Sequence, residues 1–242
     1  MSGDTVQSRV VLVTGAAGGL GRELVAEFAA QGWRVAAAWH QQPFGDPRSD
    51  SIQPVQLDVT NRANVEAVVD EILRRWGQID VLVNNAGMTA DALVSRMTLE
   101  NWDHALDANL KGAFLCSQAV LRPMMKQRDG HIINLSSHSA LAGTAGQSNY
   151  AAAKAGLIGL TQSLAREMGG RNVRVNAVLP GVLPTPMTQS LSANTLTQFA
   201  TANALGRIND LSEVARFIVF LAGMRNASGQ VFQLDSRIRA WT

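Results

Sequence analysis

Short apolar runs alternate with segments of helical periodicity along most of the chain. The runs are typical of strands buried on both faces of a parallel sheet, and they lie at residues 10–13, 34–39, 53–59, 79–83, 131–135, 173–179 and 231–234. Apolar residues at helical spacing predict helices between these runs, at about residues 20–30, 61–76, 99–123, 149–168 and 210–221. This alternation predicts an α/β fold, a doubly wound parallel β-sheet of about seven strands with helices on both faces.

The chain is expected to form one domain over residues 1–242. Of its 242 residues, 46% are hydrophobic, which is enough for a large core without disulfide or metal staples. No internal repeat, low-complexity tract or change of composition divides the sequence. The polar segment 41–53 contains Pro43, Gly45 and Pro47 and is interpreted as a loop rather than a linker between domains.

Composition and charge exclude several classes of protein. The 21 basic and 19 acidic side chains give a net charge of +2, and no basic run is longer than Arg74-Arg75, so nucleic acid and membrane surfaces are not expected as partners. Cys116 is the only cysteine and the four histidines are scattered, so we expect neither a disulfide nor a metal site. Residues 1–9 lack the pattern of a signal peptide, and no apolar run approaches bilayer length. A cytoplasmic protein is expected.

A glycine-rich turn follows the first predicted strand. It reads Thr14-Gly-Ala-Ala-Gly-Gly-Leu-Gly21, or T-G-x-x-x-G-x-G, and leads directly into a predicted helix, where free amides and the helix dipole favour a dinucleotide pyrophosphate. Gly15 permits the tight turn, Gly19 the approach of the phosphates and Gly21 close packing of helix and strand. The other residues of the turn that we expect at the cofactor are Ala17, Gly18 and Leu20. An ordinary strand–helix turn is the alternative interpretation.

Tyr150 and Lys154 have the spacing of an acid–base pair. Hydride transfer to a ketone develops negative charge on its oxygen, so a proton donor must lie within hydrogen-bond reach. Tyrosine is a weak acid at neutral pH, but a lysine four residues later shares its helix face, and a nearby ammonium lowers the pKa of a phenol. Tyr150 is the only tyrosine of the chain. Ser136-Ser137 follow the predicted strand 131–135, at the end of the sheet where such folds bind ligands.

Three motifs together resemble the short-chain dehydrogenase/reductase family. They are the glycine turn, Asn84-Asn85-Ala86-Gly87 after the fourth strand, and Tyr150-Ala-Ala-Ala-Lys154. The resemblance extends from about residue 10 to about residue 234, and residues 131–187 are most similar to the 3-oxoacyl-[acyl-carrier-protein] reductases of fatty-acid biosynthesis. It implies a Rossmann-type sheet, a nicotinamide cofactor and ketoreductase activity.

The resemblance also implies roles for individual residues around Tyr150. Ser137 would orient the substrate by donating a hydrogen bond to the reacting carbonyl. Asn109 would kink its helix and hold a water beside Lys154, which completes a proton relay from Tyr150 to solvent. The segment at about residues 186–206, with its small and polar residues, would form the substrate lid.

Cofactor contacts are implied along the whole chain. Asn85, Ala86 and Gly87 would close over the adenine-side ribose, and Asp58-Val59 would contact the adenine. Residues 180–187 resemble the family motif P-G-x-x-x-T-x-M, which holds the nicotinamide carboxamide. The residues of that motif that we expect at the cofactor are Pro180, Gly181, Val182, Thr185 and Met187.

The end of the second strand bears on which cofactor binds. An acidic residue there would bind the ribose diol of NAD and repel the 2′-phosphate of NADP. This end reads Ala38-Trp39-His40-Gln41, and no acid occurs between Glu27 and Asp46. We therefore expect NADPH/NADP, with Trp39 and His40 among the contacts, while NAD stays the alternative.

The expected function is NADPH-dependent reduction of a 3-oxoacyl thioester, carried by acyl carrier protein or CoA. A dehydrogenase of another secondary alcohol (sugar, steroid or small alcohol) is the alternative, because its catalytic residues would be identical. A non-catalytic dinucleotide-binding protein is disfavoured by the intact Tyr150–Lys154 pair. The resemblance implies a homotetramer built through helices near residues 99–125 and 149–168. The family's glycine pair after the last strand is replaced here by Asp235-Ser236-Arg237-Ile238, which leaves room for a mixed assembly with a paralogue.

Overall fold

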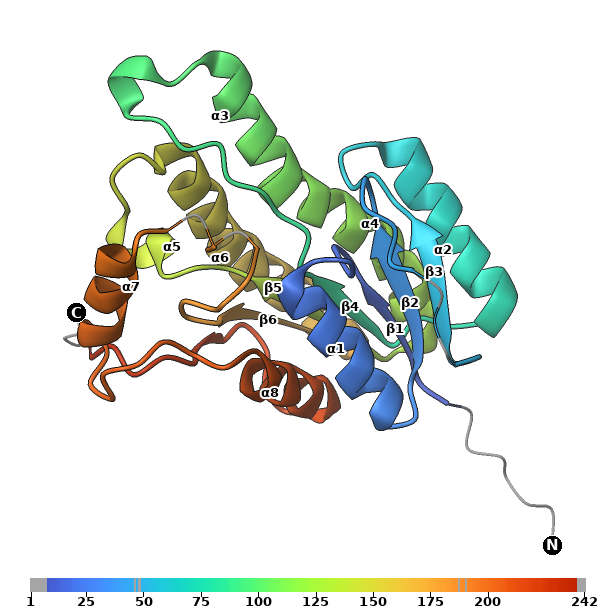
Figure 1. Cartoon of the computed structure of the whole chain (residues 1–242). Coiled ribbons are helices and arrows are strands. Elements are labelled where there is room, and N and C mark those ends of the chain that lie inside the picture. Colours follow the sequence, from blue (N-terminus) through green and yellow to red (C-terminus); the bar gives the residue numbers. More distant parts are fainter. Residues whose placement is uncertain (1–7, 46, 48, 187, 190, 239–242) are drawn as a thin grey trace, which may run out of the picture.

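The structure of the chain, a computed structural model, describes residues 8–45, 47, 49–186, 188–189 and 191–238 (Figure 1). Seven strands form one sheet in the order β3-β2-β1-β4-β5-β6-β7. Every pair of neighbouring strands is parallel. The predicted α/β fold with a doubly wound sheet is confirmed.

The bounds of the strands and helices follow the hydrophobic pattern closely. The strands are β1 (Val10–Val13), β2 (Arg34–Trp39), β3 (Ile52–Gln56), β4 (Val81–Asn84), β5 (Gly130–Leu135), β6 (Val173–Leu179) and β7 (Val231–Gln233). The helices are α1 (Gly19–Ala30), α2 (Arg62–Trp76), α3 (Leu99–Leu106), α4 (Gly112–Gln127), α5 (Ser139–Ala142), α6 (Ser148–Met168), α7 (Ala193–Thr201) and α8 (Leu211–Gly223). Short 3₁₀ turns lie at Val94–Arg96 and Gly169–Arg171.

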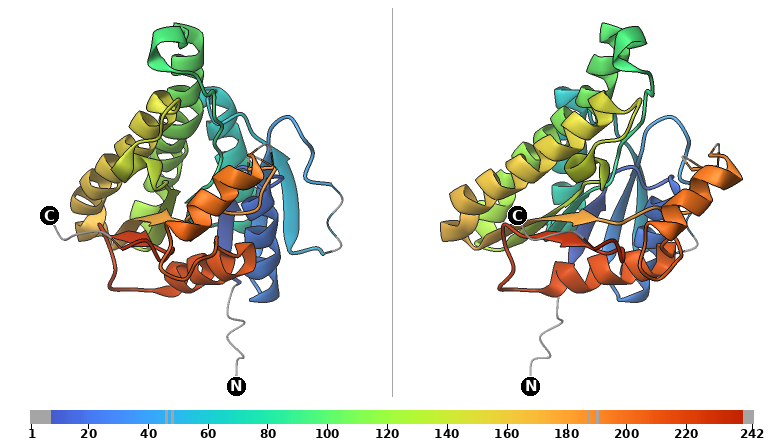
Figure 2. Two further views of the ribbon diagram at one scale, coloured as in Figure 1. Left: turned by 60° about the vertical axis from the view of Figure 1, so that its left-hand side comes forward. Right: turned by 90° about the vertical axis from the view of Figure 1, so that its left-hand side faces the viewer.

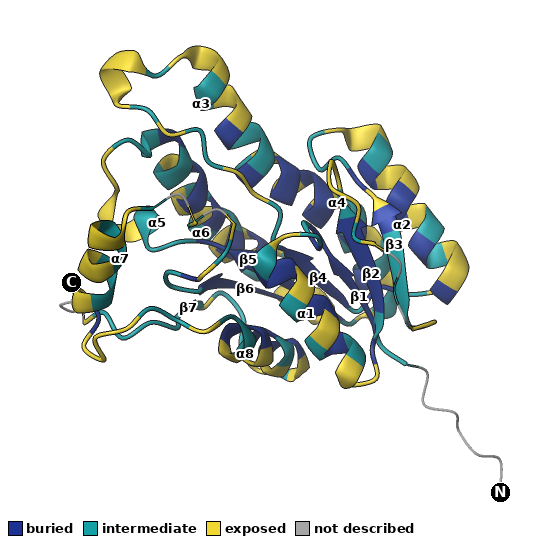
Figure 3. Cartoon of the chain, in the orientation of Figure 1, coloured by how far each residue is buried: buried dark blue, intermediate teal, exposed yellow. Residues whose placement is uncertain are grey.

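Helices cover both faces of the sheet. Helices α1 and α8 pack side by side on one face, and α2, α4 and α6 lie on the other (Figure 1; Figure 2). Each face has its own apolar core. One core packs Leu24 and Phe28 of α1 against Ile218 of α8, whereas the other joins Ile72 of α2 and Val120 of α4 to the sheet. The central strands are buried between these layers, β3 and β7 at the edges are partly exposed, and the outer faces of the helices are exposed (Figure 3).

Several segments differ from the elements that the pattern predicts. The strand expected over residues 53–59 ends at Gln56, and the short helix α5 was not predicted. The helix expected over residues 99–123 is divided into α3 and α4 by a π-helical turn, Asp107–Lys111, and α4 continues through Pro123 to Gln127. A proline inside a helix removes one backbone hydrogen bond, and the remaining turns of α4 are retained. The segment predicted as a lid contains helix α7, whose first turn is capped by Ser192 through the amide of Thr195.

The strand order places a crevice at the carboxyl ends of the central strands. The chain leaves β1 toward β2 on one side and later adds β4 on the other side, and ligands of open α/β sheets bind at this reversal. Residues that follow β1, β4, β5 and β6 therefore meet at one edge. No helix of the described residues is both long and apolar enough to cross a bilayer.

Candidate active site

A cavity of about 740 Å³ lies at this edge of the sheet. Its walls include residues that follow β1, β4, β5 and β6, together with part of the segment 186–206. The residues predicted for the site that line the cavity are Gly15, Ala17, Gly18, Gly19, Leu20, Gly21, Asn85, Ala86, Gly87, Asn109, Ser137, Tyr150, Lys154, Pro180, Gly181, Val182 and Thr185. The fold thus brings together segments that are far apart in the sequence.

The glycine turn between β1 and α1 has a shape that side chains would disrupt. Gly15 has a φ of 64°, in the left-handed region, and a Cβ there would lie 2.8 Å from the Cα of Ala86. A Cβ on Gly21 would collide with the carbonyl oxygen of Gly15. No side chain caps the amino end of α1, which begins after Gly18. The turn therefore presents free amides at a positive helix end, as pyrophosphate binding requires.

Thr14 and Asn85 connect the glycine turn to the segment after β4. The hydroxyl oxygen of Thr14 accepts hydrogen bonds from the backbone amides of Asn85 and Ala86, both at 3.0 Å. The Asn85 side chain donates to the carbonyl oxygens of Thr14 and Gly15, at 3.0 and 3.1 Å. The Asn85 side chain thus fixes the glycine turn, and the Thr14 hydroxyl fixes the segment after β4. From the sequence, Thr14 was named only as the first residue of the glycine motif.

The first turn of α6 positions Tyr150 and Lys154. Asn149 is fully buried and donates to the carbonyl oxygens of Ala90 and Asn101, both at 3.0 Å. Its side-chain oxygen accepts the amide of Tyr150 at 2.8 Å. Sequence reasoning missed Asn149, whose bonds to residues about fifty positions away become visible only in the fold.

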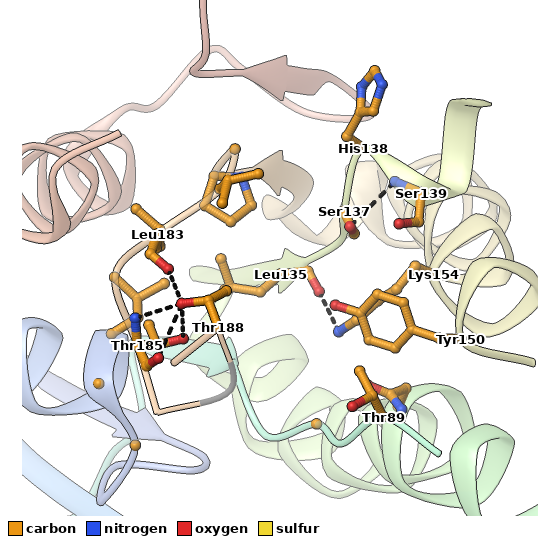
Figure 4. A pocket seen from close by; sticks show the side chains of 18 of the residues that line it. Thr89, Leu135, Ser137, His138, Ser139, Tyr150, Lys154, Leu183, Thr185 and Thr188 are labelled. Atoms are coloured by element: carbon orange, nitrogen blue, oxygen red, sulfur yellow. Dashed lines mark hydrogen bonds between the residues drawn. The ribbon is translucent and has the colours of Figure 1, made fainter. Parts of the chain in front are cut away.

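Ser137, Tyr150 and Lys154 surround one part of the cavity (Figure 4). Burial raises the pKa of Tyr150 above its ordinary value, and Asp91 adds to the increase, whereas a side-chain hydrogen bond with Ser137 acts in the opposite direction. The predicted lowering of this pKa by Lys154 is therefore wrong for this structure, because burial of the phenol outweighs every favourable contact. The phenol, which is protonated at neutral pH at its ordinary pKa, thus stays in the form that a proton donor needs.

Lys154 is buried next to Tyr150 and reaches the wall of the cavity. Its ammonium donates to the carbonyl oxygen of Leu135 at 2.8 Å and lies 5.5 Å from the centre of the Tyr150 ring. Burial lowers the pKa of Lys154 from 10.5 to about 8. The hydroxyl of Ser136 donates to the Lys154 carbonyl at 2.8 Å and fixes the backbone of this turn. Ser136 and Ser137 both line the cavity, but the Ser136 hydroxyl is engaged with the backbone, whereas Ser137 is the serine that interacts with the Tyr150 side chain.

Asn109 lies in the π-helical turn and faces Lys154 across Gly87. Its amide nitrogen donates to the carbonyl oxygens of Met88 and Ala105, both at 2.8 Å. Its side-chain oxygen is buried and has no hydrogen-bond partner among the described residues. A Cβ on Gly87 would lie 2.5 Å from this oxygen and 3.4 Å from the Lys154 ammonium. The site therefore has an unused buried acceptor next to a buried cation, as the predicted proton relay requires.

The loop after β6 closes over the glycine turn. A Cβ on Gly19 would lie 2.9 Å from the methyl group of Thr185. The hydroxyl of Thr188 donates to the carbonyl oxygen of Leu183 at 2.6 Å and accepts the amide of Thr185 at 2.9 Å (Figure 4). Thr188, which sequence reasoning missed, thus fixes the turn that carries Thr185. Met187 lies outside the described residues.

Comparison with known proteins agrees with the geometry. The sequence profile described as short chain dehydrogenase matches residues 9–196. The chain belongs to the short-chain dehydrogenase family. A protein of Thermotoga maritima named 3-oxoacyl-[acyl-carrier-protein] reductase is 42% identical over 241 residues, which cover 95% of this chain and 97% of the relative. An Escherichia coli protein with this name is 40% identical over 220 residues (89% and 90%), and one of Synechocystis is 38% identical over 239 (94% and 96%).

Membership of this family makes the chain an oxidoreductase of CH–OH groups with a nicotinamide dinucleotide cofactor. The residues present fit such a cofactor, because the glycine turn lines the cavity at the uncapped amino end of α1, and because the buried side-chain oxygen of Asn109 has no hydrogen-bond partner among the described residues. Within the described ranges, no group of three or more His, Cys, Asp and Glu side chains could hold a metal ion.

Four predicted residues lie beyond the cavity, toward the expected adenine end. Trp39, His40, Asp58 and Val59 are not among its lining residues. The Asp58 carboxylate accepts the amide and hydroxyl of Thr60, at 2.9 and 2.7 Å, and the His40 ring lies 3.9 Å from its other oxygen. Burial alone would raise the pKa of Asp58, but the hydrogen bonds from Thr60 and the nearby His40 lower it below its ordinary value. Asp58 thus organises the turn after β3, and its contact with adenine stays a prediction.

Proposed function

We propose that this short-chain dehydrogenase reduces the ketone of a 3-oxoacyl thioester to the 3-hydroxyacyl thioester, with NADPH as the reductant. The observation that carries the proposal is the convergence of Ser137, Tyr150 and Lys154 on one cavity beside the glycine turn. The relatives named 3-oxoacyl-[acyl-carrier-protein] reductase match along almost the whole chain and support the substrate class.

Each side chain of the site has a defined task. When bound, the reduced nicotinamide supplies the hydride for the carbonyl carbon. Tyr150, whose phenol is protonated at neutral pH, gives its proton to the carbonyl oxygen, and the hydroxyl of Ser137 donates a hydrogen bond to the same oxygen. Lys154 holds positive charge below the phenol and stabilises the phenolate left after transfer. The unpaired oxygen of Asn109 accepts a hydrogen bond from the water that returns a proton through Lys154.

An NADPH-oxidation assay with an acetoacetyl thioester, run against a panel of simple ketones and secondary alcohols, tests this proposal. We expect kcat/KM for the thioester to exceed that of every other compound by roughly tenfold or more, because a site with matched hydrogen-bond donors discriminates strongly. A sugar, steroid or small alcohol as the preferred substrate would contradict the proposal.

NADPH rather than NADH is proposed as the cofactor. The end of β2 reads Trp39-His40-Gln41, so it lacks the acidic residue that would bind the ribose diol of NAD and repel a 2′-phosphate. The guanidinium of Arg22 donates to the carbonyl oxygens of Ala17 and Phe44, at 3.0 and 3.1 Å, and adds a cation beside the glycine turn. Measurement of kcat/KM with both cofactors tests the assignment, and a preference for NADH would overturn it.

We further propose a cytoplasmic homotetramer that accepts its substrate from acyl carrier protein. The proposed contact surfaces are the outer faces of α4 and α6, and Phe114 of α4 is 40% exposed on this side of the sheet. Light scattering on the purified chain should give the mass of four copies. A monomeric mass, or a fourfold assembly only with a paralogue present, would contradict the homotetramer.

A further inference from the structure

The segment after β7 forms a wall of the substrate side of the cavity. Its backbone is joined to the end of the lid region, because the Ser236 carbonyl accepts the amide of Ala204 at 3.0 Å and the Ser236 amide donates to the Asn203 side chain at 3.0 Å. Asn209 joins the same segment to the loop after β6, since its amide group donates to the carbonyl oxygens of Leu234 and Pro180 at 3.2 and 2.9 Å. The segment therefore has a fixed place between two walls of the cavity.

Arg237 projects from this segment into the cavity. It lines the cavity together with Leu191, Thr195 and Phe199 of the lid region, and only 9% of its side chain is exposed. Its Nε and Nη2 both donate to one carboxylate oxygen of Asp235, the first at 2.6 Å. The Asp235 side chain is 2% exposed, and its other oxygen accepts the side chain of Gln233 at 2.5 Å. A charged side chain is thus buried and held rigidly in the substrate region.

The Asp235–Arg237 pair is anchored against the loop after β6. A Cβ on Gly181 would lie 2.9 Å from the Cβ of Asp235, and Gly181 belongs to the motif that we expect to hold the nicotinamide carboxamide. Burial on its own would raise the pKa of Asp235, but the hydrogen bonds from Arg237 and Gln233 lower it, so the carboxylate stays ionised. The pair therefore lies beside the loop that we expect to hold the nicotinamide, in the wall of the cavity that Ser137 and Tyr150 also line.

The Arg237 guanidinium has more N–H groups than its bonds to Asp235 use. It carries five N–H groups, and Asp235 uses the Nε proton and one proton of Nη2. Among the described residues no acceptor engages Nη1. Because Asp235 already balances the positive charge, these donors suit a neutral oxygen acceptor better than a free anion. Leu191 and Phe199 supply apolar surface to the same cavity.

We propose that Arg237 binds the thioester carbonyl oxygen of the substrate and thereby selects 3-oxoacyl thioesters over simple ketones. This inference rests on the proposed function, because it names the group that distinguishes that substrate class. A 3-oxoacyl thioester carries a second carbonyl two carbons from the reacting ketone, whereas a simple ketone carries none. Asp235 is a positioning residue that holds the guanidinium toward this oxygen.

Two variants and a control test the proposal. Arg237→Gln removes the charged donor but leaves a buried carboxylate unpaired, which alone destabilises a fold. The double variant Asp235→Asn/Arg237→Gln removes both charges, so no unpaired carboxylate is left to destabilise the fold. Arg216→Gln is the matched control, because Arg216 lies on the exposed side of α8 and does not line the cavity. Thermal unfolding of each variant shows whether it is folded before kinetics are compared.

Steady-state kinetics with an acetoacetyl thioester and a simple ketone give the main result. We expect KM for the thioester to rise roughly 10- to 100-fold in both Arg237 variants, as for loss of a hydrogen bond to a charged group, with a smaller change in kcat. The selectivity for thioester over ketone should fall by the same factor, and Arg216→Gln should behave as the wild type. An unchanged selectivity in folded Arg237 variants would overturn the proposal.

A binding measurement separates this proposal from the proposed function. Calorimetric titration of the acetoacetyl thioester into the NADPH complex of Tyr150→Phe, with and without Arg237→Gln, measures binding without turnover. Weaker binding to Tyr150→Phe/Arg237→Gln than to Tyr150→Phe supports the role of Arg237. If the wild type nevertheless shows no turnover, the absence of turnover refutes the proposed activity alone. Equal binding refutes the role of Arg237 and leaves the activity standing. No binding to either protein refutes both.

Discussion

The stability of this fold should depend steeply on pH through one buried histidine. His131 lies on β5, fully buried, at the end of the sheet opposite the cavity. Its Nε2 lies 2.8 Å from the amide nitrogen of Asn176, which can only donate, so the imidazole is neutral. Burial and the cations of Arg174 and Arg9 lower the pKa of His131 from 6.5 to about 3, and Asp129 and the backbone of Ala222 only partly oppose this.

The sign and size of the effect follow from linkage between proton binding and folding. The unfolded chain binds a proton at His131 below about pH 6.5, while the folded chain stays neutral there down to a pH of about 3. The contribution of His131 to the free energy of unfolding is therefore complete above pH 6.5 and is lost as the pH falls toward 3. Between about pH 7.5 and about pH 5 the loss is about 2 kcal/mol, and at about pH 3 it is about 4 kcal/mol.

Urea unfolding of the wild type and of His131→Gln measures this contribution. Glutamine keeps an acceptor for Asn176 but does not titrate, so the difference in unfolding free energy between wild type and variant should shrink or reverse by about 2 kcal/mol from about pH 7.5 to about pH 5. The five tryptophans provide the fluorescence signal. His104→Gln, on the exposed side of α3, is the control and should follow the wild type. Parallel pH profiles of wild type and His131→Gln would refute the reasoning.

Further predictions concern the cofactor cradle and Lys154. Gly21→Ala places a methyl group against the Gly15 carbonyl, so we expect about 1–3 kcal/mol lower unfolding free energy and a higher Kd for NADPH in fluorescence titration. Gly159→Ala, in open space on α6, should instead raise the unfolding free energy by about 0.5–1 kcal/mol; equal effects of the two changes would contradict the model of the turn. Lys154→Ala removes the ammonium bonded to Leu135 and should lower kcat and raise the NADPH Kd; an unaltered Kd would speak against its contact with the cofactor.

The fold could be predicted from the sequence because its strands carry strong local signals. The runs at 10–13, 34–39 and 173–179 are buried along almost their whole length, and their predicted bounds agree with β1, β2 and β6. Helix α7 was missed because its surface residues are mostly Thr, Asn and Gln, which obscure a helical stripe. The end of α4 was placed too early because Pro123 was taken as its limit, although a packed helix tolerates one missing bond.

The site was predictable where a motif names the residue, and not where its effect depends on burial. The Tyr150–Lys154 spacing predicts their shared helix face, yet the direction of the Tyr150 pKa shift was wrong, because spacing does not reveal how fully a phenol is buried. Asn149 and Arg237 act through partners distant in sequence, and only the three-dimensional arrangement shows those contacts.

The central claim is that the Tyr150 hydroxyl is the proton donor for ketone reduction, and one measurement tests it directly. Since Tyr150 is the only tyrosine, no other phenol can take its place in Tyr150→Phe. Single-turnover oxidation of bound NADPH by an acetoacetyl thioester should be slower in this variant by roughly 10²- to 10⁴-fold, with the NADPH Kd little changed. A rate close to that of the wild type would contradict the account.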